Sequence, residues 1–285
     1  MEYKVVDFFI VGAPKCGTST IHEILEKSGM FDLPKTKELH YFSYPEVANT
    51  YYSYEVKNNI RKTKKAYENS FMNNTLPKVD NSPSYLFNNA SARRIYEHSP
   101  DAQIIVILRD PVERAISHYL MDLRLGIVDK PFQDTLQDSL FHKEYIGNSL
   151  YYESLEVYNS QFGKNFHIFT FDDLFKKNDL SEIIRLGVIF GKKSLFLEIK
   201  GVQANKFAEP RFKSILQKYR YCEICRNLYK VFPNFLKAPI RRLFYKTSGD
   251  KPNMMDNKKT IENLVMSDWS LTQDFLQLKK QQDYE

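Results

Sequence analysis

The stretch FFIVGAPKCGTST, residues 8–20, decides the fold that this sequence predicts. Its first residues are β-branched or aromatic and continue an apolar run from Val5, a pattern typical of a buried strand that ends at Gly12. A loop with a second glycine follows. From about Ser19, apolar side chains recur at helical spacing until Gly29, which predicts a helix and its end. A strand, a glycine-containing loop and a helix in this order predict the opening of a parallel α/β fold.

The loop between Gly12 and Gly17 has the glycine spacing of a phosphate-binding loop, but its lysine is displaced. In the version that binds ATP and GTP, G-x-x-x-x-G-K-[ST], the lysine follows the second glycine. Here Lys15 lies inside the loop and Thr18 follows the second glycine. The backbone N–H groups of residues 13–19 and the N-terminus of the next helix still predict an anion-binding site.

A second strongly apolar stretch, IIVILRD at residues 104–110, ends in an arginine and an aspartate. A nucleotide-hydrolysing loop also needs magnesium, which an aspartate at the end of a second strand usually binds. Arg109 takes that place here, and Asp110 is better explained as the cap of the helix that follows. We therefore expect two cationic phosphate sites, Lys15 and Arg109, and no metal site.

The other predicted elements complete an α/β fold with a central parallel sheet flanked by helices. At the start of the helix predicted over residues 110–126, Asp110 is the expected N-cap, Pro111 takes the first position and Glu113 completes a capping box. Residues from about 45 to 75 lack a clear period and are expected to be helical or irregular. The further predictions are a short strand and turn within residues 76–87, helices at 91–100, 131–140 and 149–163, and a strand with its exit turn at 165–174.

The remainder of the chain predicts mostly helix. It is rich in lysine and broken at Pro233, Pro239 and Pro252. Cys222 and Cys225 have the spacing of a redox pair or of half a zinc site, but no second pair accompanies them and a structural role is expected. Because no repeat or linker interrupts the sequence, residues 1–285 are expected to form a single domain.

The composition is that of an ordinary globular protein, with 42% hydrophobic and 27% charged residues. The net charge of +6 and the pI of about 8.9 suit an anionic ligand, although a solvated basic surface explains them equally well. The apolar N-terminal run leads straight into the glycine loop, so a first strand is expected rather than a signal peptide. No apolar run approaches the ~18 residues needed to span a bilayer. With three cysteines, a reducing cytoplasm is the expected compartment.

Two motifs give the sequence a family resemblance. GAPKCGTST (residues 12–20) and IIVILRDPVERAISHY (residues 104–119) resemble the two nucleotide-binding motifs of the PAPS-dependent sulfotransferases, where PAPS is 3′-phosphoadenosine 5′-phosphosulfate. The resemblance implies that Lys15 reaches the oxygen that bridges phosphate and sulfate, and that Arg109 and Ser117 bind the 3′-phosphate. The other residues that it implies for nucleotide binding in the first motif are Cys16, Gly17, Thr18, Ser19 and Thr20.

Further segments are similar to the carbohydrate branch of that family, which includes the heparan sulfate sulfotransferases. KELHYF, residues 37–42, is like the K-E-x-H-F-F stretch of this branch. It implies Glu38 as the base that takes the acceptor's proton, with His40 as the alternative on the same face of an extended segment. Residues 147–174 follow a pattern in which Tyr151 contacts the nucleotide, and NKFAEPRF at residues 205–212 offers Arg211. The resemblance covers roughly residues 6–215.

One segment departs from the pattern of this branch. DNSPSYL, residues 80–86, is similar to its E-K-S-P-x-Y segment, but Asn81 stands where the branch has lysine, and Asp80 takes the acidic position. If that lysine assists catalysis, its charge is either absent here or supplied by Lys35 or Lys37.

The resemblance implies an enzyme that moves a sulfuryl group from PAPS to a hydroxyl, or alternatively an amine, of a carbohydrate or glycoconjugate acceptor. The acceptor is expected in a cleft built from residues 38–60, 80–90 and 120–150. No nucleic-acid partner and no membrane-spanning segment are expected, and the sequence carries no signal for an oligomeric state. The expected location is the bacterial cytoplasm, unless the chain is the excised catalytic domain of a larger protein. Two alternatives stay open: a P-loop ATP-dependent small-molecule kinase, and a non-catalytic protein that binds a nucleotide or glycan.

Overall fold

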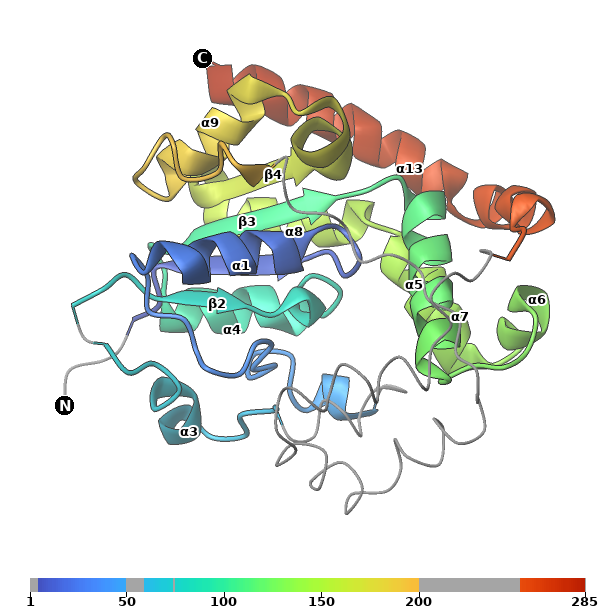
Figure 1. Ribbon diagram of the computed structural model, residues 1–285, viewed down its shortest axis with the longest axis horizontal. Helices are drawn as coiled ribbons and strands as arrows, with labels where there is room; N and C mark the ends of the chain where they lie inside the picture. The colour runs from blue at the N-terminus through green and yellow to red at the C-terminus, as the bar shows by residue number, and fades with distance from the viewer. Residues whose placement is uncertain (1–4, 50–58, 74, 200–251, 285) are drawn as a thin grey trace, which may run out of the picture.

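A parallel sheet of four strands forms the centre of the computed structural model, which describes residues 5–49, 59–73, 75–199 and 252–284 (Figure 1). The strands lie in the order β2-β1-β3-β4. Because all four run in the same direction, their carboxyl ends meet at one edge. The strands are β1 (Phe8–Gly12), β2 (Val79–Asn81), β3 (Gln103–Leu108) and β4 (Phe166–Thr170). The predicted α/β class and its strands are therefore confirmed.

The strand order places a change of direction beside β1. The chain leaves β1 for β2 on one side and then returns to β3 on the other. In open parallel sheets, ligands bind at the carboxyl edge where the order reverses in this way. β1 and β3 pair with Phe8 opposite Gln103, and their register shifts between Ile10 and Gly12, where the chain leaves the sheet for the glycine loop.

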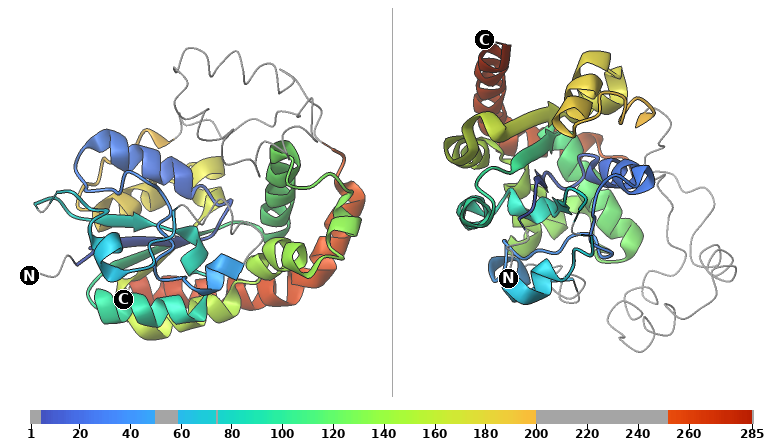
Figure 2. Two further views of the ribbon diagram at one scale, coloured as in Figure 1. Left: turned by 90° about the horizontal axis from the view of Figure 1, so that it is seen from below. Right: turned by 90° about the vertical axis from the view of Figure 1, so that its left-hand side faces the viewer.

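Helices cover both faces of the sheet (Figure 2). The helix α1 (Thr18–Ser28) and the later α9 (Leu180–Ile189) lie on one face, and α4 (Asn89–His98) and α8 (Tyr152–Phe162) lie on the other. The predicted end of the first helix is confirmed, since Gly29 caps α1 in the left-handed conformation that glycine adopts without strain. Apolar side chains from both faces meet the strands in one core, which includes Ile10, Ile105 and Tyr158.

A second apolar cluster lies beyond the carboxyl edge, around α5 (Pro111–Leu125). Asp110 caps this helix as predicted, because its Oδ1 accepts from the Glu113 N–H at 2.9 Å. The predicted capping box is only half formed, since the Glu113 carboxylate pairs with Arg109 rather than returning to the helix start. The helix predicted over residues 131–140 is also corrected, because it divides into α6 (Phe132–Thr135) and α7 (Ser139–Tyr145), with Asp138 capping the second.

The other described elements are short. The excursion expected at residues 45–75 is irregular or helical wherever it is described, and residues 205–212, Arg211, Cys222, Cys225, Pro233 and Pro239 lie outside the described residues. The short elements are η1 (Glu46–Asn49), α3 (Lys64–Glu68), η2 (Pro83–Tyr85), η3 (Gly147–Ser149), η4 (Gly163–Asn165) and η5 (Asp172–Lys177).

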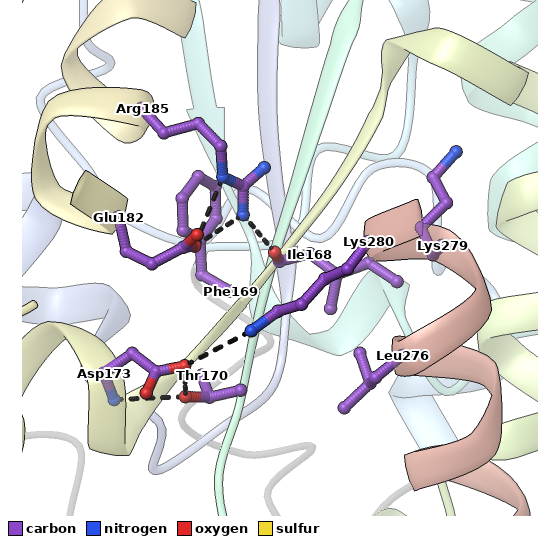
Figure 3. Close-up of a pocket in the computed structure, with 9 residues that line it drawn as sticks. All are labelled: Ile168, Phe169, Thr170, Asp173, Glu182, Arg185, Leu276, Lys279 and Lys280. Atoms are coloured by element: carbon purple, nitrogen blue, oxygen red, sulfur yellow. Dashed lines mark hydrogen bonds and ion pairs between the residues drawn. The ribbon is translucent and has the colours of Figure 1, made fainter. Parts of the chain in front are cut away.

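The long helix α13 (Met255–Tyr284) ties the end of the described chain to the sheet, and confirms the helical expectation for that part of the sequence. Asp268 on this helix accepts from the Tyr151 and Tyr152 N–H groups, at 2.6 and 3.2 Å to its two oxygens, and so caps α8. Lys280 reaches Asp173 behind β4, at 3.9 Å (Figure 3). In the part of the chain that the structure describes, no helix is both long and apolar enough to cross a membrane.

The α8 cap provides a test of how α13 is anchored. Replacing Asp268 with alanine leaves the first N–H groups of α8 without an acceptor, so we expect the free energy of unfolding to fall by about 1–2 kcal/mol. Urea denaturation followed by circular dichroism measures this. Asp274→Ala is the matched control, because Asp274 is exposed on the same helix. Equal stability of the two variants would show that the cap does not stabilise the fold.

Candidate functional site

The loop between β1 and α1 forms the centre of the site, and its backbone is tightly constrained. Lys15 and Gly17 both adopt positive φ angles, of 72° and 90°. Glycine is required at position 17, because a Cβ atom there would lie 2.4 Å from Cε2 of Phe175. α1 begins directly after Gly17 without a side-chain cap. Its first N–H groups and the positive end of its dipole are thus available to an anion.

Lys15 lies against α5 with little to neutralise its charge. Its Nζ contacts the Met121 Sδ at 3.1 Å, and a thioether is a weak acceptor. Burial and, after it, the nearby positive charge of Arg124 lower the pKa of Lys15 to about 8; Arg114 and Arg109 add to this lowering and Asp122 opposes it. An anion placed beside this ammonium would reverse the shift. Lys15 is therefore arranged to meet an anionic group.

Arg109 follows β3 and lies across the same loop. Its Nη1 approaches the Lys15 carbonyl at 3.5 Å, and its guanidinium stacks over the Phe171 ring at 4.7 Å. Its Nη2 donates to Glu113 Oε2 at 2.9 Å, while its Nε is buried without a hydrogen-bond partner among the described residues. Ser117 is half-buried further along the same helix as Glu113. The structure thus brings Lys15 and Arg109 together, as the sequence predicts.

Cys16 and Tyr151 lie beneath the loop rather than on its open side. Both are fully buried, and the Tyr151 hydroxyl donates to the Arg109 carbonyl at 3.0 Å. Burial raises the pKa of the Cys16 thiol to about 11, so it stays protonated and donates to the Pro14 carbonyl at 3.6 Å. These two residues support the loop and the end of β3 from below. Of the hydroxyl residues at the start of α1, Thr18 is buried, Ser19 exposed and Thr20 half-buried.

Glu38 and its neighbours form a charged cluster beside the loop. The Lys37 Nζ donates to the Ser19 Oγ at 2.8 Å and lies 3.2 Å from Glu38 Oε1. The His40 Nε2 lies 3.7 Å from the other carboxylate oxygen of Glu38. Glu38 and His40 do meet, but not from an extended segment as predicted, since both have left-handed backbones with φ of 64° and 53°. The Glu38 carboxylate thus lies between Lys37 on one side and His40 on the other.

The segment after β2 holds His40 in place. Its Nδ1 pairs with the Ser84 Oγ at 2.8 Å, and its backbone N–H donates to the Ser82 Oγ at 3.4 Å. Burial lowers the pKa of His40, so the ring tends to be neutral. The Glu38 side chain, in contrast, is 39% exposed and can reach a ligand.

Asp80 anchors this arrangement from the core. It is fully buried and accepts hydrogen bonds from Ser82 Oγ, Tyr85 OH and Tyr67 OH, at 2.7, 2.8 and 2.9 Å. Burial raises the pKa of Asp80 to about 6, although the three hydroxyl donors favour its charged form. Asp80 therefore fixes Ser82, which in turn receives the His40 N–H.

Several residues of the site escaped the sequence analysis. Phe171 and Phe175 follow β4 and contact Arg109 and Gly17, and the sequence showed this stretch only as the exit of a strand. The one available signal was an aromatic residue directly after a strand end. Met121 and Tyr67 carried no signal, because Met121 lies in a helix predicted from the residues at its start and Tyr67 lies in the segment that lacks a clear period.

Two cavities in the described part of the structure are lined by neither Lys15 nor Glu38. One, of about 210 Å³, lies between α5 and α13 beside Glu113, Lys258 and Trp269. The other, of about 20 Å³, lies behind β4, where Arg185 pairs with Glu182 and Lys280 reaches Asp173 (Figure 3). The second holds no more than a water molecule and its charges are paired, so it serves the packing of α13. The acceptor cleft stays a prediction, since residues 50–58 lie outside the described ranges.

Comparison with known proteins gives a match to the sulfotransferase domain family over residues 6–195. A segment of 114 residues is 31% identical to the membrane-associated sulfotransferase kil1 of Dictyostelium discoideum, covering 40% of this chain and 22% of that protein. A segment of 45 residues is 44% identical to the human heparan sulfate glucosamine 3-O-sulfotransferase 6, covering 16% of this chain and 13% of that protein. The matched segments thus span less than a quarter of either relative's length.

A solved structure is also similar. A sulfotransferase from Alicyclobacillus acidocaldarius has 27% sequence identity and a TM-score of 0.59, and the match covers 66% of this chain and 81% of that one.

The buried Asp80 predicts a pH dependence of stability. Because its folded pKa of about 6 lies above the ordinary 3.8, its contribution is fully present below pH 3.8 and is lost as the pH rises through 6. Asp80→Asn does not titrate, so the wild type should lose up to about 3 kcal/mol relative to this variant between pH 4 and 7. Denaturant unfolding across that range measures the difference. A difference that stays constant with pH would contradict the assignment, whatever its absolute size.

Proposed function

Because the chain belongs to the sulfotransferase family, we propose that it transfers the sulfuryl group of PAPS to a hydroxyl, or alternatively an amine, of a carbohydrate-like acceptor. The observation that carries this proposal is the pairing of two cations at one open helix end. Lys15 lies in the loop before α1, and Arg109 reaches the carbonyl of Lys15 from the end of β3. Two such cations suit a ligand with two separate anionic groups.

The residues present fit this donor. The Lys15 ammonium contacts a thioether, which is a weak acceptor, and the buried Nε of Arg109 has no hydrogen-bond partner among the described residues, so both have capacity for a ligand. The start of α1, with Thr18, Ser19 and Thr20, would hold the 5′-phosphate, and Arg109 with Ser117 would hold the 3′-phosphate. Tyr151 would support Arg109 from below through its carbonyl. Arg211, proposed as a further contact, lies outside the described residues.

PAPS supplies a sulfuryl group that is activated by its link to a phosphate leaving group. The chain's own residues must take the acceptor's proton and stabilise the charge that develops on that phosphate. Lys15 and the N–H groups at the start of α1 are fixed before reaction and serve the second task. Glu38 serves the first, because its carboxylate is exposed beside the same helix end.

His40 is better suited to orient Glu38 than to replace it. Its Nδ1 is engaged by Ser84 and its Nε2 faces Glu38, while the side chain itself is 5% exposed. Such a buried ring has little access to an acceptor, whereas it restricts the rotation of the carboxylate that it faces. We therefore assign the base to Glu38 and a positioning role to His40.

The carbohydrate class of the acceptor rests on similarity. The segment KELHYF supports it, as does the short similarity to a heparan sulfate glucosamine 3-O-sulfotransferase. A kinase that uses ATP would need a magnesium ligand where Arg109 stands. A non-catalytic protein that only binds a nucleotide or glycan would not need a proton acceptor such as the Glu38 carboxylate, which Lys37 and His40 hold beside the helix end. Incubation with radiolabelled PAPS and a panel of glycans, lipids and small alcohols tests the activity and the acceptor class.

The 3′-phosphate assignment gives a binding test. Arg109→Ala should weaken the affinity for adenosine 3′,5′-bisphosphate by roughly 2–3 kcal/mol, as expected for a charge-assisted hydrogen bond. The affinity for adenosine 5′-phosphate, which lacks the 3′-phosphate, should fall much less. Calorimetry without magnesium measures both ligands, and Arg93→Ala is the control, because Arg93 is 71% exposed on α4. An equal loss for both ligands would mean that Arg109 does not bind the 3′-phosphate.

The base assignment gives a kinetic test. Glu38→Gln keeps the shape of the side chain and removes its basicity, so the turnover rate should fall by about 100-fold or more. The affinity for adenosine 3′,5′-bisphosphate should stay near that of the wild type. His40→Ala should lower turnover less, because Glu38 still accepts the proton. Steady-state assays with a binding titration distinguish the two residues: an active Glu38→Gln beside an inactive His40→Ala would assign the base to His40.

A further inference from the structure

Two side chains from different segments meet the first turn of α1. Lys37, a member of the charged cluster around Glu38, donates to the Ser19 Oγ at 2.8 Å. Asn81, at the end of β2, donates through Nδ2 to the Thr18 carbonyl at 2.8 Å. Because β2 pairs with β1, with Asn81 opposite Ile10, this asparagine lies beside the strand that leads into the phosphate loop. Positions 37 and 81 thus flank the same anion-binding helix end.

Asn81 cannot neutralise an anion there. It is 2% exposed, its Nδ2 is used by a backbone carbonyl, and its Oδ1 is buried without a hydrogen-bond partner among the described residues. The amide is neutral, and turning it over would place an oxygen against the Thr18 carbonyl. Position 81 therefore supplies no charge at this polar point of the site, although it faces the same first turn of α1 as Lys37.

Lys37 does supply a charge at this point. Its side chain is 23% exposed, and its ammonium lies between the Ser19 hydroxyl and the Glu38 carboxylate. An ammonium group has three donors, so a third remains for a ligand at the start of α1. Lys35, two residues earlier, is exposed and lies outside these contacts.

We propose that Lys37 is a further catalytic residue, which contacts the sulfuryl group in transfer and takes the place of the charge that Asn81 lacks. This rests on the proposed function. In the step, the bond between sulfur and the bridging phosphate oxygen breaks, and its electron pair stays on the phosphate. A new bond forms between sulfur and the acceptor oxygen, and the acceptor's proton goes to Glu38.

The contact between Lys37 and Glu38 determines when during the reaction Lys37 interacts most strongly with the ligand. Before transfer, the charge of Lys37 is shared with the Glu38 carboxylate at 3.2 Å. As Glu38 takes the proton, it loses its negative charge, and the ammonium is left to interact with the sulfuryl and phosphate oxygens. The interaction of Lys37 with the ligand thus strengthens as the reaction proceeds, which is what raises a rate rather than an affinity.

The test removes the charge at position 37 and restores it at position 81. Lys37→Met should lower the turnover rate by about 100-fold, while the affinity for adenosine 3′,5′-bisphosphate, which lacks the sulfuryl group, stays close to wild type. The double variant Lys37→Met/Asn81→Lys should regain at least a tenth of the lost rate. Lys27→Met, an exposed lysine on α1, is the control and should match the wild type. Binding titrations on every variant establish that each one is folded.

The outcomes separate this inference from the proposed function. A wild type that releases no adenosine 3′,5′-bisphosphate from PAPS with any acceptor would refute both. If the wild type turns over and Lys37→Met is equally active, this inference alone is overturned. It is also overturned if Lys35→Met loses activity while Lys37→Met keeps it. A slow Lys37→Met that Asn81→Lys fails to restore would mean that Lys37 acts only by holding Glu38.

Discussion

The packing of the loop between β1 and α1 against Phe171 and Phe175, the aromatic pair after β4, is the constraint on which the site depends. Gly17 leaves no space for a side chain because Phe175 fills it, and Phe171, at the other end of the same aromatic pair, lies beneath the Arg109 guanidinium. One short segment after β4 therefore sets both the turn that starts α1 and the position of the second cation. This segment, together with Tyr151 below the end of β3, thus positions Arg109 relative to the loop that holds Lys15.

The charges around Lys15 explain why the carboxyl edge of the sheet is suited to an anion. Lys15 has Arg109, Arg114 and Arg124 near it, and their charges add to burial in lowering its pKa. A fold that places cations together in this way loses stability at that edge, and recovers it when a ligand with opposite charge binds. The carboxylates nearby have defined partners: Glu113 pairs with Arg109, and Glu38 with Lys37.

The sequence predicts the elements whose signals are local. The strands, the glycine loop and the Asp110 cap each depend on a few neighbouring residues, and each is found where the pattern indicates it. The cations Lys15 and Arg109 could be paired in advance, because parallel strands bring their carboxyl ends to one edge.

Long-range contacts could not be predicted in the same way. The cap that Asp268 gives to α8, and the aromatic contacts of η5, join segments that no local pattern relates. The left-handed backbones of Glu38 and His40 were also missed, because positive φ is uncommon outside glycine and the serines that contact His40 come from a distant segment after β2. The hydrogen bond from Lys37 to Ser19 likewise joins two segments that no local pattern relates.

The link from α13 to α8 has a consequence for synthesis on the ribosome. Asp268 meets Tyr151 across 117 residues of chain, and Tyr151 is the residue that supports Arg109 from below. The loop, the sheet and the second cation all emerge well before this brace exists. A nascent chain therefore carries both cations before their framework is complete, and the carboxyl edge of the sheet gains this brace only when translation has passed the middle of α13.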